Sequence, residues 1–139
     1  MKFAAIAAMT TALLAAPAFA EGDAAKGEKT FKKCKSCHTI ADGDNVITKG
    51  GKTGPNLFGL PSRVIGSTDF KYSKSAAAAS ELGAEWTEED FIAWVANPTD
   101  FLRTKLDDPK AKSKMSFRLK KADDAADVWA YLVSVSPES

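Results

Sequence analysis

The chain has 139 residues, of which 45% are hydrophobic and 27% are charged, a size and balance typical of one small globular domain. Its 19 Lys and Arg residues nearly balance its 18 Asp and Glu residues, which argues against a general nucleic-acid-binding protein. Leu, Ile, Val and Phe make up only 23 of the 119 residues from position 21 onward, so we expect a cofactor, a metal or disulfides to complete a thin core.

The first 20 residues have the pattern of a secretory signal peptide. Lys2 precedes an apolar run over residues 3–14, and a small-x-small site follows at residues 18–20. This pattern predicts cleavage after Ala20, a single mature domain over residues 21–139 and export to a bacterial periplasm. The alternative is a membrane anchor of about 18 residues, which is barely long enough to cross a bilayer, contains Pro17 and lacks a second charged flank.

The mature chain has the pattern of short helices joined by loops. Ala24, Gly27 and Phe31 recur at three- and four-residue spacing, which predicts a helix over residues 24–35 with Asp23 as its N-cap. Residues 41–69 are rich in Gly, Asp, Asn and Pro and have no periodicity, which predicts a loop of about 29 residues. Such a long loop is uncommon in a compact domain unless it packs on a functional group.

Four further helices are predicted in the second half of the chain. They cover the Ala-rich residues 72–82, a segment that begins at Thr87 and ends before Asn97-Pro98, residues 99–106, and a final segment capped by Asp123 or Asp124. The final helix has one broad apolar face. That face consists of Val128, Trp129, Tyr131, Leu132 and Val135. No alternating strand pattern competes with these helices, so the expected fold class is all-α.

The string Cys34-Lys35-Ser36-Cys37-His38 carries the strongest chemical signal. In an exported chain, Cys-x-x-Cys-His indicates covalent attachment of a c-type haem, with His38 as an iron ligand. Three other readings exist. A disulfide between Cys34 and Cys37 leaves His38 unexplained, a thioredoxin-like dithiol belongs in a βαβ unit, and structural zinc needs four ligands where the chain has three Cys and His residues.

Met115 is the candidate for the second iron ligand. It is the only Met left after removal of the leader, and it lies in the polar stretch 112–117, where a core-filling Met is not expected. Ligation by His38 and a Met thioether predicts a six-coordinate electron carrier with a raised potential. The alternative is a haem enzyme or a gas-binding haem protein in which Met115 dissociates and opens the iron.

With these motifs in this order, the mature chain resembles the class I cytochromes c, particularly the large bacterial c2 and c550 types. The segments that carry the resemblance are 22–29, 34–38, 52–59, Trp86, Asn97-Pro98, 112–117 and 130–132. The resemblance implies a cytochrome c fold, in which a few short helices and long loops wrap around one covalently attached haem c.

The resemblance also implies roles for single residues around the haem. The Pro55 carbonyl is expected to accept the Nδ1 proton of His38, which fixes the tautomer and leaves Nε2 for iron. Arg63, Tyr72 and Trp86 match positions that neutralise or hydrogen-bond the haem propionates. For Trp86, ordinary core packing is the alternative.

Other matched positions concern the pocket wall and the helix packing. Trp94 stands where many members have a Tyr that bonds the Met sulfur, so that bond is either absent or made by the indole N–H. Ala76 stands where mitochondrial members often have Asn, and Phe117 completes the expected pocket. Gly27 and Phe31 match the contact between the first and last helices.

A sealed haem leaves no substrate site, so the predicted protein is a monomeric carrier of single electrons and not an enzyme. Its expected donor is a membrane quinol-cytochrome c oxidoreductase of the bc1 type, and its acceptor is a photosynthetic reaction centre, an oxidase or a periplasmic reductase. Lysines that flank the two ligand segments predict transient docking on acidic partners. They are Lys32, Lys33, Lys35, Lys105, Lys112, Lys114 and Lys120.

Overall fold

A computed structural model describes residues 21–137, and the predicted leader lies outside these residues. The elements in chain order are α1 (Ala24–Phe31), β1 (Ile40–Asp42), β2 (Asn45–Thr48), the short 3-10 helix η1 (Leu60–Ser62), α2 (Lys74–Ser80), α3 (Glu88–Ala96), α4 (Pro98–Leu106) and α5 (Ala122–Val135). All five predicted helices are present. Within residues 21–137, no helix combines the length and apolarity that a membrane crossing requires.

The first helix starts where the sequence predicts and ends earlier. The Asp23 carboxylate accepts the N–H groups of Ala25 and Lys26, at 2.9 and 3.1 Å, and so caps α1. After Phe31 the backbone changes to three-residue turns, because Cys34 N–H donates to the Phe31 carbonyl at 2.8 Å. Helix α1 therefore ends four residues before its predicted end at residue 35, and these tighter turns lead into the Cys34–His38 segment.

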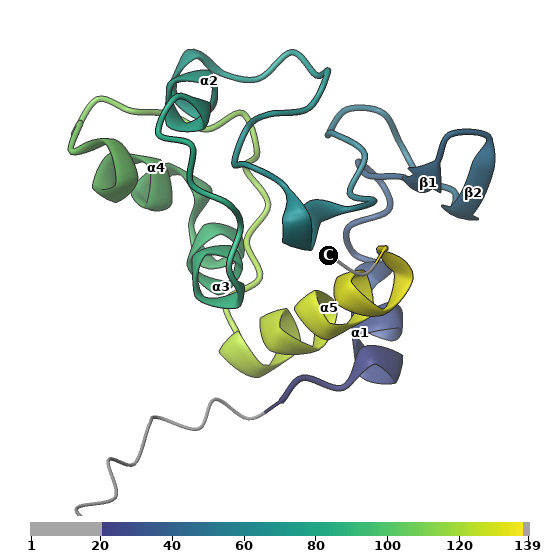
Figure 1. Cartoon of the computed structure of the whole chain (residues 1–139). Coiled ribbons are helices and arrows are strands. Elements are labelled where there is room, and N and C mark those ends of the chain that lie inside the picture. Colours follow the sequence, from purple (N-terminus) through teal and green to yellow (C-terminus); the bar gives the residue numbers. More distant parts are fainter. Residues whose placement is uncertain (1–20, 138–139) are drawn as a thin grey trace, which may run out of the picture.

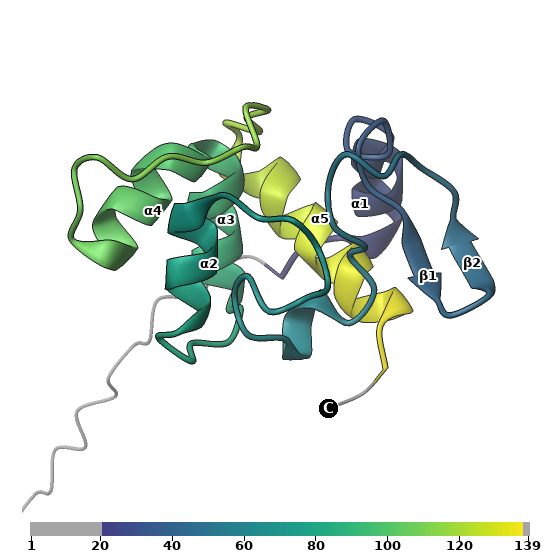
Figure 2. The ribbon, with the colours of Figure 1, turned by 90° about the horizontal axis from the view of Figure 1, so that it is seen from above.

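Helices α1 and α5 pack side by side through a glycine. A Cβ atom placed on Gly27 would lie 1.9 Å from the Asp127 carbonyl oxygen, so only the bare backbone permits this approach. The rings of Phe31 and Tyr131 meet at a centroid distance of 5.6 Å. The predicted contact between the first and last helices is therefore confirmed, and the two views of the ribbon show these helices side by side (Figure 1 and Figure 2).

The prediction of a structureless loop over residues 41–69 is wrong at two places. Residues 40–48 form an antiparallel hairpin with Asp42 opposite Asn45, and Gly43 turns the chain with a φ of 57°. Only Ile40 of this hairpin is fully buried, so the strands lack the alternation that reveals strands in a sequence. The fold is therefore mainly helical with one small sheet, and η1 adds a 3-10 turn further along.

The predicted cap of the last helix is also wrong. Helix α5 begins at Ala122, and Lys121 occupies the N-cap position without a side-chain hydrogen bond. Asp123 and Asp124 lie in the first turn instead, where their charges favour the positive end of the helix dipole. The expected apolar face is confirmed, with Val128 and Leu132 fully buried within it.

Polar side chains cap the N-termini of α2, α3 and α4 by accepting backbone N–H groups. Ser73 caps α2, and Thr87 caps α3 by accepting the Asp90 N–H at 3.1 Å. Asn97 ends α3 and caps α4, which begins at Pro98, a residue suited to a first helical turn. Viewed from above, α2, α3 and α4 gather on one side, α1 and the hairpin lie on the other, and α5 runs between them (Figure 2).

The close approach at Gly27 predicts that Gly27→Ala destabilises the protein by about 1–3 kcal/mol, because the methyl group forces α1 away from α5. Helix propensity alone predicts the opposite, a gain of about 1 kcal/mol. Denaturant unfolding of the haem-loaded protein measures the change. The control is Glu28→Ala at the adjacent exposed position, for which a change within about 0.5 kcal/mol is expected. A stabilised Gly27→Ala variant would contradict the packing argument.

Candidate functional site

A cavity of about 260 Å³ lies among the helices and loops, and its wall includes both motifs singled out in the sequence. Cys34, Cys37 and His38 contribute to the wall from the first motif, and Met115 contributes from the second. Much of the remaining wall is apolar and comes from many parts of the chain. These apolar residues include Phe31, Leu57, Leu60, Ile65, Phe70, Ala76, Phe91, Val95 and Val128. The fold thus brings two segments about 80 residues apart to one space.

His38 is held in one orientation at the cavity wall. It is 8% exposed, and its Nδ1 lies 2.8 Å from the Pro55 carbonyl oxygen. Because a carbonyl only accepts, Nδ1 carries the proton and Nε2 keeps its lone pair for a ligand. Burial lowers the pKa of His38, although the hydrogen bond to Pro55 raises it in part, so the neutral ligating form is favoured. The predicted contact between His38 and Pro55 is present.

Gly54 makes this arrangement possible. A Cβ on Gly54 would lie 2.3 Å from Cε1 of the His38 ring, so the backbone of residue 54 packs directly on the imidazole. Asn56 then anchors the same loop, since its side chain accepts the Ala41 N–H at 3.1 Å and donates to the Ala41 carbonyl at 2.7 Å. Neither Gly54 nor Asn56 has a role that was predicted from the sequence, although both belong to the string 52–59 that carries the resemblance.

The two cysteines lie in a single backbone turn. The Cys37 and His38 N–H groups both donate to the Cys34 carbonyl, at 3.1 and 3.0 Å. Burial raises the pKa of the Cys34 thiol to about 11, which is opposite to the lowered pKa of a redox-active dithiol cysteine. Among residues 21–137, no group of three or more His, Cys, Asp or Glu side chains is placed so that it could hold a metal ion. Structural zinc needs four such ligands.

Arg63 brings a positive charge into the cavity wall. Its guanidinium donates to the carbonyl oxygens of Asn56 and Phe58, at 2.9 and 3.2 Å, and burial lowers its pKa from the usual value. The ion pairs found among the described residues do not include Arg63. A half-buried cation without a carboxylate nearby suits a ligand that carries its own anionic groups. Tyr72 also lines the cavity, with its hydroxyl hydrogen-bonded to Thr68.

Aromatic side chains close another part of the wall. Trp86 stacks on Phe101 at a centroid distance of 5.8 Å and meets Trp94 edge-on at the same distance. Trp86 and Trp94 both line the cavity, so Trp86 combines the pocket position with the core packing that was its alternative role. Phe117 also lines the cavity and is 39% exposed. Ala76 adds an apolar methyl from α2.

Six of the seven lysines expected to dock are exposed, and two of them, Lys33 and Lys114, lie in the cavity wall. Lys105 differs. Its ammonium donates to both Asp90 carboxylate oxygens, at 3.1 and 3.0 Å, and both side chains are largely buried. It also lies 5.7 Å from the centre of the Phe101 ring. Lys105 therefore ties α4 to α3, and its placement does not favour a docking role.

The chain has close relatives among characterised sequences. A model of the cytochrome c family matches residues 24–136. The chain is 54% identical over 138 residues to a cytochrome c2 of Rhodobacter capsulatus, and the match covers 97% of this chain and 98% of that protein. It is 46% identical over 145 residues to a cytochrome c-550 of Paracoccus denitrificans, with 100% of this chain and 92% of that protein covered.

The fold has similar solved structures as well. The cytochrome c2 of Rhodobacter sphaeroides matches with a TM-score of 0.82 at 43% identity, covering 86% of this chain and all 100% of that one. The cytochrome c2 of Rhodobacter capsulatus matches with a TM-score of 0.76 at 52% identity, covering 82% and 98%. The resemblance and the fold predicted from the sequence are confirmed.

The contact between Gly54 and His38 predicts that Gly54→Ala lowers the free energy of unfolding of the haem-loaded protein by about 1–3 kcal/mol, because the methyl group displaces the imidazole. Gly43→Ala is the matched comparison. No atom lies within 4 Å of a Cβ there, so that variant measures only the cost of a positive φ, about 1 kcal/mol. Gly54 has no positive φ, so any loss there reflects the contact with the imidazole, and an unchanged free energy of unfolding in Gly54→Ala would contradict this prediction.

Proposed function

The chain belongs to the cytochrome c family, and we propose that it is a periplasmic carrier of single electrons whose haem iron is held by His38 and Met115. Members of the family carry one covalently bound haem c, and this chain contains the attachment motif over residues 34–38. The observation that carries the proposal is the shared cavity, which has the Cys-x-x-Cys-His turn and the Met115 segment in one wall.

The residues of the cavity fit such a haem. Cys34 and Cys37 lie in one turn, which suits two thioether links to one macrocycle, and the apolar wall suits its flat hydrocarbon surface. Arg63 supplies a charge for the propionates, with Tyr72 and Trp86 as further polar partners. The bound haem supplies an iron that changes between Fe(III) and Fe(II) by one electron.

His38 and Met115 determine what the iron does. Pro55 keeps the imidazole proton on Nδ1, so that Nε2 of His38 is a fixed and strongly basic donor. The Met115 thioether is a soft ligand that favours the reduced iron and raises the potential. Since His38 and Met115 would both bind the iron, no substrate reaches the metal. Electrons are then transferred through the edge of the site near Cys37 and Phe117, which are both exposed.

The proposed partners follow from the exposed charge. Lys32, Lys33 and Lys35 lie beside the first ligand segment, and Lys112, Lys114 and Lys120 lie beside the second. Positive side chains around an exposed edge attract acidic partners and release them quickly. A quinol-cytochrome c oxidoreductase of the bc1 type is the proposed donor. A reaction centre, an oxidase or a periplasmic reductase is the proposed acceptor.

The proposed location rests on the leader pattern of residues 1–20 and on the haem motif itself. Relatives such as the cytochrome c2 of Rhodobacter capsulatus match the chain over almost its whole length, leader region included. We place the mature domain, residues 21–139, in the periplasm as a monomer after cleavage at Ala20.

A redox titration followed by visible absorbance tests this function. The native protein is expected to show a one-electron haem couple at a clearly positive potential and to bind no carbon monoxide when reduced at neutral pH. Met115→Ala is expected to lower the midpoint potential and to bind carbon monoxide, because the thioether no longer fills the iron site.

Two results would contradict the proposal. Carbon monoxide binding by the native reduced protein would favour a haem enzyme or gas-binding protein with a labile Met115. A protein without a visible chromophore, and with a two-electron couple between about −270 and −120 mV, would instead show a thiol-disulfide pair at Cys34 and Cys37.

The docking lysines predict an electron-transfer rate that falls as ionic strength rises. Lys33→Gln is expected to reduce the low-salt rate with bc1-containing membranes by about two- to threefold and to flatten the salt dependence. Lys49→Gln removes the same charge from an exposed position that does not line the cavity, and should leave the rate unchanged. Equal effects of the two variants would point to net charge rather than local docking.

A further inference from the structure

The segment that carries Met115 has no regular secondary structure of its own. Between α4 and α5, residues 107–121 form turns and irregular chain. Such a segment keeps one conformation only if other elements satisfy its polar groups. The Lys112 N–H donates to the Ser75 hydroxyl of α2 at 3.0 Å, and the Leu119 N–H donates to the Val95 carbonyl of α3 at 2.7 Å.

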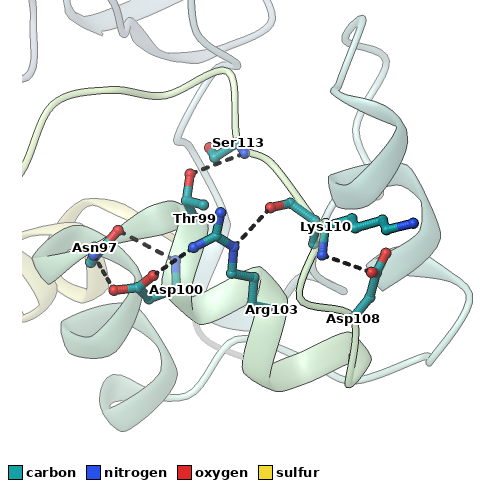
Figure 3. A network of polar contacts seen from close by, with 8 residues as sticks. Asn97, Thr99, Asp100, Arg103, Asp108, Lys110 and Ser113 are labelled. Carbon is teal, nitrogen blue, oxygen red and sulfur yellow. Dashed lines mark hydrogen bonds and ion pairs between the residues drawn. The ribbon is translucent and has the colours of Figure 1, made fainter.

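Helix α4 makes a pair of further contacts with this segment (Figure 3). The Ser113 N–H donates to the Thr99 hydroxyl, and Nε of Arg103 donates to the Ala111 carbonyl, both at 3.3 Å. We call these two contacts the α4 clamp. Thr99 and Arg103 are four residues apart, about 6 Å along a helix. Ala111 and Ser113 are two residues apart, about 6.6 Å in extended chain, so both contacts form together.

A tight turn sets the direction of the clamped chain. Asp107 adopts the left-handed conformation with a φ of 50°, and the Asp108 carboxylate accepts the Lys110 N–H at 2.9 Å. The chain therefore reverses after α4 and runs back along it, which places Ala111 near Arg103 and Ser113 near the start of the helix. Ala111 is only 1% exposed, so its carbonyl needs the partner that Arg103 supplies.

The clamp reaches Met115 through one residue. The Ser113 hydroxyl accepts the Met115 N–H at 3.0 Å, while the Ser113 N–H is the group bound by Thr99. Arg103 is oriented in turn by Asp100, whose carboxylate lies 3.5 Å away, and Asn97 donates to that same carboxylate. The cap of α4 is thus linked through Asp100 and Arg103 to Ala111, and Thr99 is linked through Ser113 to the backbone of Met115.

We propose that Thr99 and Arg103 are positioning residues for Met115, which hold residues 111–113 on α4 and so disfavour the conformation in which the thioether has left the iron. This inference rests on the proposed ligation by Met115. It separates two properties of the protein. The ligand itself sets the kind of iron site, whereas the α4 clamp sets how rarely that site opens.

Imidazole binding to the oxidised, haem-loaded protein measures this opening, because imidazole takes the iron position only after Met115 leaves. Thr99→Val keeps the shape of the side chain but removes the hydroxyl, and is expected to bind imidazole about fivefold more tightly, the equivalent of one hydrogen bond. Thr99→Ser retains a hydroxyl and should restore an affinity close to that of the native protein. Thr104→Val is the matched control, since it makes the same change at an exposed position of the same helix.

Arg103→Met gives a second and independent measurement. Its side chain is 43% exposed, so water replaces part of the lost contact, and an increase in imidazole affinity of about twofold is expected. If Thr99→Val and Arg103→Met bind imidazole as weakly as the native protein and Thr104→Val, the clamp stays intact when Met115 leaves and the proposal fails. The far-red charge-transfer absorption of thioether-bound ferric haem is the separate check, because its absence from the native protein would overturn ligation by Met115 itself.

Discussion

The structure depends on a cavity that the side chains of the chain do not fill. Apolar side chains that line such a space gain dispersion contacts from a cofactor that occupies it, because protein interiors are close-packed. The chain has few large aliphatic residues, and several members of its hydrophobic core cluster also line this space. A covalently attached haem forms the centre of this core, so the contacts that hold the cofactor also stabilise the fold. This accounts for a small domain with long irregular segments.

Those segments keep their shape because polar side chains bond to backbone groups. Asn56 bonds to both backbone groups of Ala41 and also accepts the Phe58 N–H at 3.0 Å, which joins the hairpin to the loop that follows it. Thr48 meets the Tyr131 hydroxyl at 2.9 Å and ties the same hairpin to α5. The hairpin and the loop after it are therefore tied to each other and to α5, so the loop segments around the cavity are held by a hydrogen-bond network rather than by a large sheet.

Charged groups in the structure fall into two kinds. Lys105 is largely buried and paired with Asp90, so its charge joins two helices. The lysines near the mouth of the cavity are exposed, and there a long-range field acts on partners more than on the fold. Arg63 stands between the two kinds, because it is half-buried and we propose that the cofactor supplies its counter-charge. Residue type alone does not separate Lys105 from the exposed lysines, whereas the family resemblance gave Arg63 a role of its own.

The sequence by itself determined the chemistry of the centre. The spacing of Cys34, Cys37 and His38 is local and lies within one turn, and the Asp23 and Thr87 caps act on their own helices, so these features follow from neighbouring residues. Resemblance to a known family added the contact between Pro55 and His38. The hairpin over residues 40–48, the uncapped start of α5, the pairing of Lys105 and the hold of Thr99 on Ser113 were decided only by the tertiary structure. Each of these depends on which distant segment comes near, or on burial on one side only, and neither leaves a periodic or local pattern in the chain.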